Sequence, residues 1–114
     1  MKVLFLLIFI VSNFWINQEK IKFTILYKKN DPCPGANIFV KNTEFGTTSD
    51  LQGNAELILP NANQTIVVSM IGPTYSFKLI KSIDSVSVNF KRKSVIYFYK
   101  GKKVKKAKLN LDGM

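Results

Sequence analysis

The sequence comprises 114 residues, with 17 Lys plus Arg, seven Asp plus Glu, one cysteine and no histidine. This length fits a single domain, and a hydrophobic share of 46% is typical of a chain that folds around a core. The absence of histidine excludes Ser-His-Asp and Cys-His catalysis and His-ligated zinc. A single cysteine excludes an internal disulfide and a CxxC redox pair. The formal charge of +10 is therefore the main indication of a binding partner.

The N-terminal segment has a basic start followed by nine consecutive apolar residues, at positions 3–11. This pattern predicts a secretory signal peptide over residues 1–17, because the apolar run is shorter than the roughly 20 residues that span a bilayer. The cleavage site departs from the usual pattern of small residues, since Trp15 and Asn17 would stand at positions −3 and −1. An uncleaved N-terminal anchor and a buried first strand are the alternatives.

From residue 21 onward, apolar residues alternate with polar ones or form short β-branched runs, and both patterns are typical of β-strands. Stretches rich in Pro, Gly, Asn and Asp separate the runs and predict turns. No segment of ten or more residues shows the 3.6-residue apolar period of a helix. This spacing predicts an antiparallel β-sandwich of seven or eight strands with Greek-key connections. The expected strands are 21–28, in which Ile21, Phe23, Ile25 and Tyr27 share a face, then 36–41, 46–49, 55–59, 65–71, 75–79, 86–90 and 94–99.

The stretch PCPGANIFVKNTEFGTTSDLQGN, at residues 32–54, is followed by LILP at 57–60 and IVVSMIG at 66–72. Together these segments resemble the carboxypeptidase regulatory-like domain, in the form that precedes TonB-dependent outer-membrane receptors of Gram-negative bacteria. The resemblance covers about residues 20–90. It implies a seven-stranded antiparallel Greek-key β-sandwich, similar to transthyretin (prealbumin), that is non-catalytic and serves as an accessory or interaction module. The zinc ligands and catalytic glutamate of carboxypeptidases belong to a separate domain, so the resemblance implies no peptidase. We expect no metal and no cofactor.

The positions that match the family motif shape turns or allow close approach of backbones. None of them supplies a nucleophile, a base or a metal ligand, and we therefore expect a protein that is not an enzyme. An enzyme subunit or a small hydrolase is the alternative class, which the absence of histidine disfavours. The lone Cys33 is expected to be a small, partly buried side chain and not a reactive thiol. The motif positions are Pro34, Gly35, Gly46, Asp50, Gly53 and Gly72.

The excess positive charge is concentrated near the C-terminus. Residues 18–90 carry seven lysines against six acidic residues, whereas no acidic residue occurs from 85 to 111. We therefore divide the chain into a signal peptide (1–17), a regulatory-like β-sandwich (18–100) and a basic C-terminal extension (101–114). The basic residues that could contact an anionic surface are Lys91, Arg92, Lys93, Lys100, Lys102, Lys103, Lys105, Lys106 and Lys108.

Several interpretations of this basic block compete. A solvated tail, or a lysine-rich edge strand that opposes aggregation, needs no ligand. Contact with an anionic surface, such as lipopolysaccharide phosphates or anionic lipid, would contribute about 1 kcal/mol per lysine. A specific protein partner is a further interpretation. Nucleic acid is disfavoured, because the neighbouring aromatic residues 97–99 must partly face the core and export removes the cytosolic nucleic-acid pool.

These observations predict an exported protein of the periplasm or the outer membrane that acts by binding. The strand edges and loops of residues 32–54 are the expected contact with a protein partner, and the basic block is expected to add electrostatic attachment to an anionic membrane surface. Relatives often continue into a plug and a barrel of several hundred residues, whereas this sequence ends at Met114. We therefore expect an accessory module and not a transporter, with a degenerate receptor fragment as the alternative.

Overall fold

The computed structural model describes residues 19–59, 64–70 and 74–111, so the expected signal peptide and Gly72 lie outside the described residues. The described residues form strands joined by turns, and none of their segments is a helix long and apolar enough to cross a membrane. The strands are β1 (Glu19–Lys28), β2 (Asp31–Pro32), β3 (Asn37–Val40), β4 (Gly46–Thr48), β5 (Asn54–Leu59), β6 (Thr65–Ser69), β7 (Thr74–Lys78), β8 (Ser85–Asn89), β9 (Ser94–Tyr99), β10 (Lys102–Lys108) and β11 (Asn110–Leu111).

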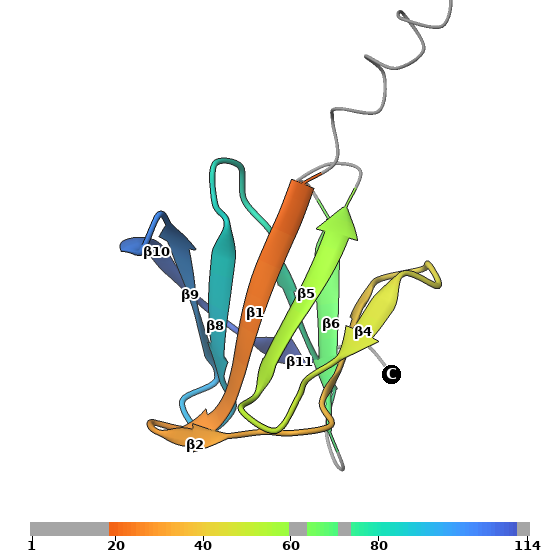
Figure 1. The fold of residues 1–114 in the computed structure, drawn as a ribbon, viewed down its shortest axis with the longest axis vertical. Coiled ribbons are helices and arrows are strands. Elements are labelled where there is room, and N and C mark those ends of the chain that lie inside the picture. The colour runs from red at the N-terminus through yellow and green to blue at the C-terminus, as the bar shows by residue number, and fades with distance from the viewer. Residues whose placement is uncertain (1–18, 60–63, 71–73, 112–114) are drawn as a thin grey trace, which may run out of the picture.

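The strands form two sheets that pack face to face (Figure 1). Sheet A has the order β10-β9-β8-β1-β2, and β5 pairs with the part of β1 that precedes its contact with β2. Sheet B has the order β11-β7-β6-β3-β4. The described part of the chain is therefore an all-β sandwich, which confirms the expected fold class.

Two details of the expected sandwich are wrong. The described residues contain eleven strands where seven or eight were expected. Strands β2 and β11 were not anticipated, and β10 was expected only as one interpretation of the basic block, the lysine-rich edge strand. Two-residue strands are too short to show a period, and β10 buries no apolar face that would reveal one. The sheets are also not purely antiparallel, because β1 and β8 pair in parallel. These two strands are far apart in the chain, so no hairpin fixes their relative direction.

The core lies between the sheets and follows the expected two-residue alternation. On β1, Ile21, Phe23 and Ile25 are all at most 1% exposed. The rings of Phe77 on β7 of sheet B and Tyr97 on β9 of sheet A meet edge to face between the sheets, with centroids 6.4 Å apart. The hydroxyl of the buried Tyr97 donates a hydrogen bond to the carbonyl oxygen of Lys78, which satisfies its one polar atom.

The alternation of β1 stops before Tyr27, which is 51% exposed and not in the core. The pairing of β1 with β2 shifts register between Leu26 and Lys28. An irregularity of this kind re-aims the side chains that follow it. Tyr27 consequently points to the surface at one end of the sandwich, where it lines the hollow described below.

Strand β10 belongs to sheet A and forms one of its edges. It pairs with β9 from Lys102 opposite Tyr99 to Lys108 opposite Ser94, with a register shift between Lys103 and Lys105. Leu109 follows, is only 6% exposed, and donates its N–H to the carbonyl oxygen of Lys93 at 2.8 Å. The chain then crosses to sheet B, where β11 pairs with β7. The described part of the expected C-terminal extension is thus folded onto the sandwich as an edge strand.

Candidate binding surfaces

The segment 32–54 carries the family motif, and its polar side chains bind their own backbone. Ser49 is buried, and its hydroxyl donates to the carbonyl oxygen of Cys33 at 2.6 Å while accepting the N–H of Ala36 at 2.8 Å. The Oδ1 atom of Asp50 accepts the N–H groups of Gln52 and Asn54, each at 2.9 Å. These groups satisfy backbone donors and acceptors of the turns, so their role in the segment is structural.

At two motif positions, Gly53 and Gly46, neighbouring atoms leave too little room for a side chain. Gly53 has φ +79°, and a Cβ atom there would overlap the carbonyl oxygen of Ile25. At Gly46 a Cβ atom would lie 3.0 Å from the Cβ of Phe39, closer than side chains normally pack. Gly35 stands in open space but has φ +75° in the turn that follows Pro34. These positions therefore shape the backbone that holds β1, β3 and β5 together.

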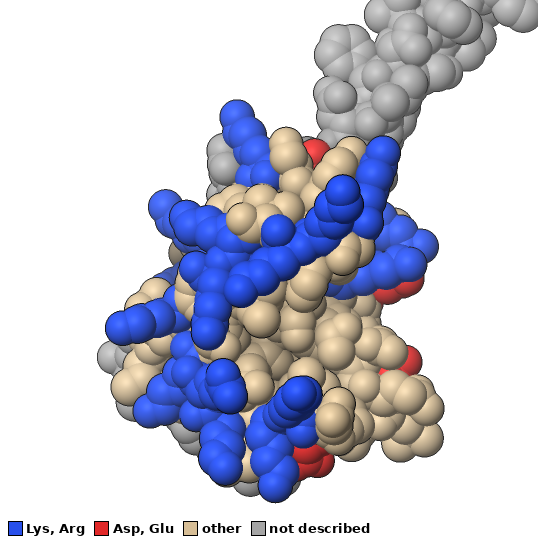
Figure 2. Space-filling view, turned by 90° about the vertical axis from the view of Figure 1, so that its left-hand side faces the viewer, with Lys and Arg blue, Asp and Glu red and all other residues tan. Residues whose placement is uncertain are grey.

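The nine basic residues named from the sequence lie on and beside the edge of sheet A, and we call this set the basic side. Lys91 to Lys93 form the turn between β8 and β9, Lys100 lies in the turn before β10, and the rest lie on β10. All nine side chains are exposed, and none forms an ion pair with another described residue. Figure 2 shows Lys and Arg gathered on this face, with acidic residues only near its margins. The structure therefore gathers one sign of charge on one side of the molecule.

The lysines of β10 project from both faces of the edge strand. Lys103 and Lys106 lie opposite Phe98 and Ile96, which point away from sheet B, whereas Lys105 lies opposite the core residue Tyr97. An ammonium on each face of an unpaired edge opposes pairing with a second copy of the same strand. It also leaves the positive charge free for an anionic partner.

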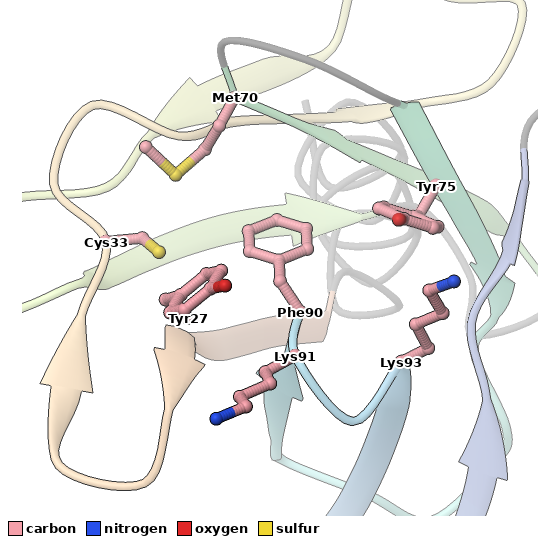
Figure 3. A pocket seen from close by; sticks show the side chains of 7 residues that line it. All are labelled: Tyr27, Cys33, Met70, Tyr75, Phe90, Lys91 and Lys93. Carbon is pink, nitrogen blue, oxygen red and sulfur yellow. The ribbon is translucent and has the colours of Figure 1, made fainter.

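A second feature is an apolar hollow at the end of the sandwich where β1 ends (Figure 3). Its volume is about 520 Å³. The rings of Tyr75 and Phe90 pack side by side in it, with centroids 5.8 Å apart, while Tyr27 and Met70 are 51% and 36% exposed. Large apolar side chains exposed together are typical of contact surfaces. The residues that line the hollow are Tyr27, Cys33, Met70, Tyr75, Phe90, Lys91 and Lys93.

The structure gives no sign of a catalytic centre in the part of the chain that it describes. Burial raises the pKa of the Cys33 thiol, and the neighbouring Asp31 carboxylate raises it further. The thiol is only 4% exposed and is held in its protonated form, so it is a poor nucleophile. Within the same residues, no three His, Cys, Asp or Glu side chains gather as metal ligands.

Sequence reasoning found the basic side but missed the apolar hollow. The alternation of apolar residues predicts Tyr27 on the core face, and nothing in the sequence connects it with Met70 or Phe90. These residues meet because the register shift in β1, the end of β6 before Met70 and the turn after β8 place them at the same end of the sandwich. A tyrosine after a run of alternating core residues is the only local signal that could have drawn attention to this end.

The sandwich with its motif turns defines a regulatory-like β domain, and comparison with known proteins identifies it. The family model for the CarboxypepD_reg-like domain matches residues 21–99, so the chain belongs to this family. It is also similar to TonB-dependent receptor P39 of Formosa agariphila, with 30% identity over 91 residues. That similarity covers 76% of this chain but only 9% of the receptor. No solved structure matches the chain.

Proposed function

We propose that this chain is a non-enzymatic interaction module that acts outside the cytoplasm, at the periplasmic side of the outer membrane. The observation that carries the proposal is membership of the CarboxypepD_reg-like family over residues 21–99. The similarity to a TonB-dependent receptor supports the outer-membrane setting. The apolar start of the sequence supports export.

The non-enzymatic part of the proposal is supported by what the polar side chains do. Ser49 and Asp50 are engaged with backbone groups. Cys33 is buried and protonated. Polar groups that hold turns together in this way are suited to shaping a surface and not to proton transfer.

We place the protein contact at the apolar hollow, because the segment 32–54 contributes Cys33 to it and Tyr27 and Met70 are exposed there. The test replaces Tyr27 in the exported full-length chain by a photo-crosslinking amino acid, and Tyr99 in a matched control. Tyr99 is 44% exposed but does not line the hollow. We expect a discrete crosslinked species from position 27 alone, suppressed by Met70→Glu. Equal crosslinking from both positions would contradict this contact site.

Attachment to an anionic surface is a second candidate function, favoured by the nine exposed cations of the basic side. We expect the full-length protein to sediment with phosphatidylglycerol vesicles at about 0.1 M salt and to be released at about 1 M, where the screening length falls to about 3 Å. Neutralising Lys102, Lys103, Lys105 and Lys106 to Gln should weaken sedimentation.

The matched control neutralises four exposed lysines outside the basic side: Lys22, Lys28, Lys78 and Lys81. It removes the same number of charges and should leave most of the binding. If both quadruple variants weaken vesicle binding equally, the attraction depends on net charge alone. If the β10 variant binds the vesicles as well as the native protein, the attachment proposal is wrong.

A further inference from the structure

A second hollow, of about 330 Å³, lies on the face of sheet A that points away from sheet B. Its floor is set by strand register. Ser87 of β8 lies opposite Ile96 of β9, and the neighbouring row pairs Leu26 of β1 with Asn89 and Asn89 with Ser94. Side chains two residues apart on a strand share a face, so these five residues form one continuous floor.

Three cations from three different elements surround this floor. Lys29 comes from the turn between β1 and β2, Arg92 from the turn between β8 and β9, and Lys106 from β10. All three side chains are exposed, and the lining contains no carboxylate. The three cations of the turn 91–93 line different hollows. Arg92 lines this one, whereas Lys91 and Lys93 line the apolar hollow.

The floor also supplies hydrogen-bond donors. The Oδ1 atom of Asn89 accepts the backbone N–H of Arg92 at 2.9 Å, which leaves the amide Nδ2 of Asn89 as a donor. The hydroxyls of Ser87 and Ser94 lie in the same lining. Three cations above amide and hydroxyl donors form an environment that complements a compact, multiply charged oxyanion.

We propose that this hollow binds the terminal oxyanion of a phosphate monoester or a sulfate ester. A phosphate monoester has three terminal oxygens and a charge of about −1.5 to −2 at neutral pH, so it can engage all three cations at once, whereas a diester offers one charge. The inference rests on the second candidate function, attachment to an anionic surface, and names the group that is recognised and the residues that recognise it. It adds Lys29 and the polar floor to the basic residues found from the sequence.

The test measures binding of the full-length protein to vesicles that carry equal total charge as phosphatidic acid, a monoester, or as phosphatidylglycerol, a diester. We expect the monoester vesicles to bind more tightly. The variant Lys29→Gln, Arg92→Gln, Lys106→Gln should lose about tenfold in affinity for them, as expected for lost charge-assisted hydrogen bonds. Its matched control, Lys102→Gln, Lys103→Gln, Lys105→Gln, removes three charges from β10 without touching the hollow and should keep the preference for the monoester.

The source of the oxyanion is distinguished by titrating the labelled protein with inorganic phosphate, then with inorganic sulfate, at constant ionic strength. A shift of the NMR signal of the Asn89 side-chain amide that does not occur in the Lys29→Gln, Arg92→Gln, Lys106→Gln variant supports the site. The ion that binds more tightly, phosphate or sulfate, identifies the preferred ester. Such movement without any vesicle binding would retain the hollow and contradict the anionic-surface function. Equal losses in both triple variants, with no monoester preference and no movement at Asn89, would overturn the hollow and retain general electrostatic attachment.

Discussion

The backbone N–H of Ile25 donates a hydrogen bond of 2.7 Å to the carbonyl oxygen of Gly53, at the point where β1 passes from β5 to β2. The carbonyl oxygen of Ile25 accepts the N–H of Cys33 at 2.9 Å, so both backbone groups of one core residue are used at this crossing. Strand β1 at Ile25, the turn at Gly53 and the chain at Cys33 therefore come together only because Gly53 has no side chain.

Gly53→Ala should destabilise the fold severely. The new Cβ would overlap the carbonyl oxygen of Ile25, and the residue would also be held at φ +79°. We expect a loss of at least about 3 kcal/mol in the free energy of unfolding, measured by urea denaturation. Gly101→Ala is the control, because Gly101 has the same φ but nothing within 4 Å of its Cβ position. It should cost only about 1–2 kcal/mol, and equal costs at both sites would refute the steric argument.

Ser49→Ala should destabilise the fold through unpaired backbone groups. The substitution leaves the carbonyl oxygen of Cys33 and the N–H of Ala36 buried without the hydroxyl that bridges them. We expect a loss of about 1–3 kcal/mol, measured by thermal or urea unfolding. The exposed Thr48→Ala serves as the neighbouring control and should change stability by less than about 0.5 kcal/mol.

Leu109→Ala should loosen β10 from sheet A. Leu109 is the buried side chain that closes the C-terminal end of this strand, and its truncation should cost about 2–5 kcal/mol. Because β10 contains five lysines, limited trypsin digestion reports its opening directly. Native protein should resist cleavage in 102–108, and Leu109→Ala should be cut there first. Val104→Ala, at a side chain that is 52% exposed, should behave like the native protein.

Stability should decline at alkaline pH partly through Tyr97. Burial raises the pKa of its phenol above the ordinary value, so the unfolded chain releases this proton at a lower pH than the folded one. The contribution is fully present below about pH 10 and is lost as the pH rises through the folded pKa. Tyr97→Phe should be less stable near neutrality but should show a shallower decline of unfolding free energy above about pH 10.

The Cys33 thiol titrates in the same direction, because burial also raises its pKa. The Tyr97 comparison is therefore made in a Cys33→Ala background, which removes this second contribution. An unchanged alkaline slope in Tyr97→Phe would show that Tyr97 does not contribute to the pH dependence.

The sequence predicted those parts of the fold in which burial imposes a pattern. Ile21, Phe23 and Ile25 alternate because one side of β1 faces sheet B, and the turn around Asp50 was visible in its residue types. Strand β10 was only one of several interpretations of the basic block, because six of its seven side chains are exposed and Ala107 alone packs partly against the core. Its pairing with β9 is made by backbone groups, and such pairing cannot be predicted from the types of residue in the strand.

The basic side was predictable from composition, whereas the hollow on sheet A was not. Lys29 is separated from Arg92 by more than half of the chain, and the parallel pairing of β1 with β8 brings their turns to one end of the sheet. Periodicity shows which side of a strand is buried but not which strands become neighbours. Residues that meet through pairing between distant strands can be found only once the topology is known.

The charges on β10 lie apart from the contacts that keep the described part of the chain folded. The five lysines of β10 make no contact that the core depends on, so they can be replaced, reversed in sign or moved along the strand at little cost in stability. Under the proposed attachment, the edge strand is a place where the preferred partner can be altered without rebuilding the scaffold.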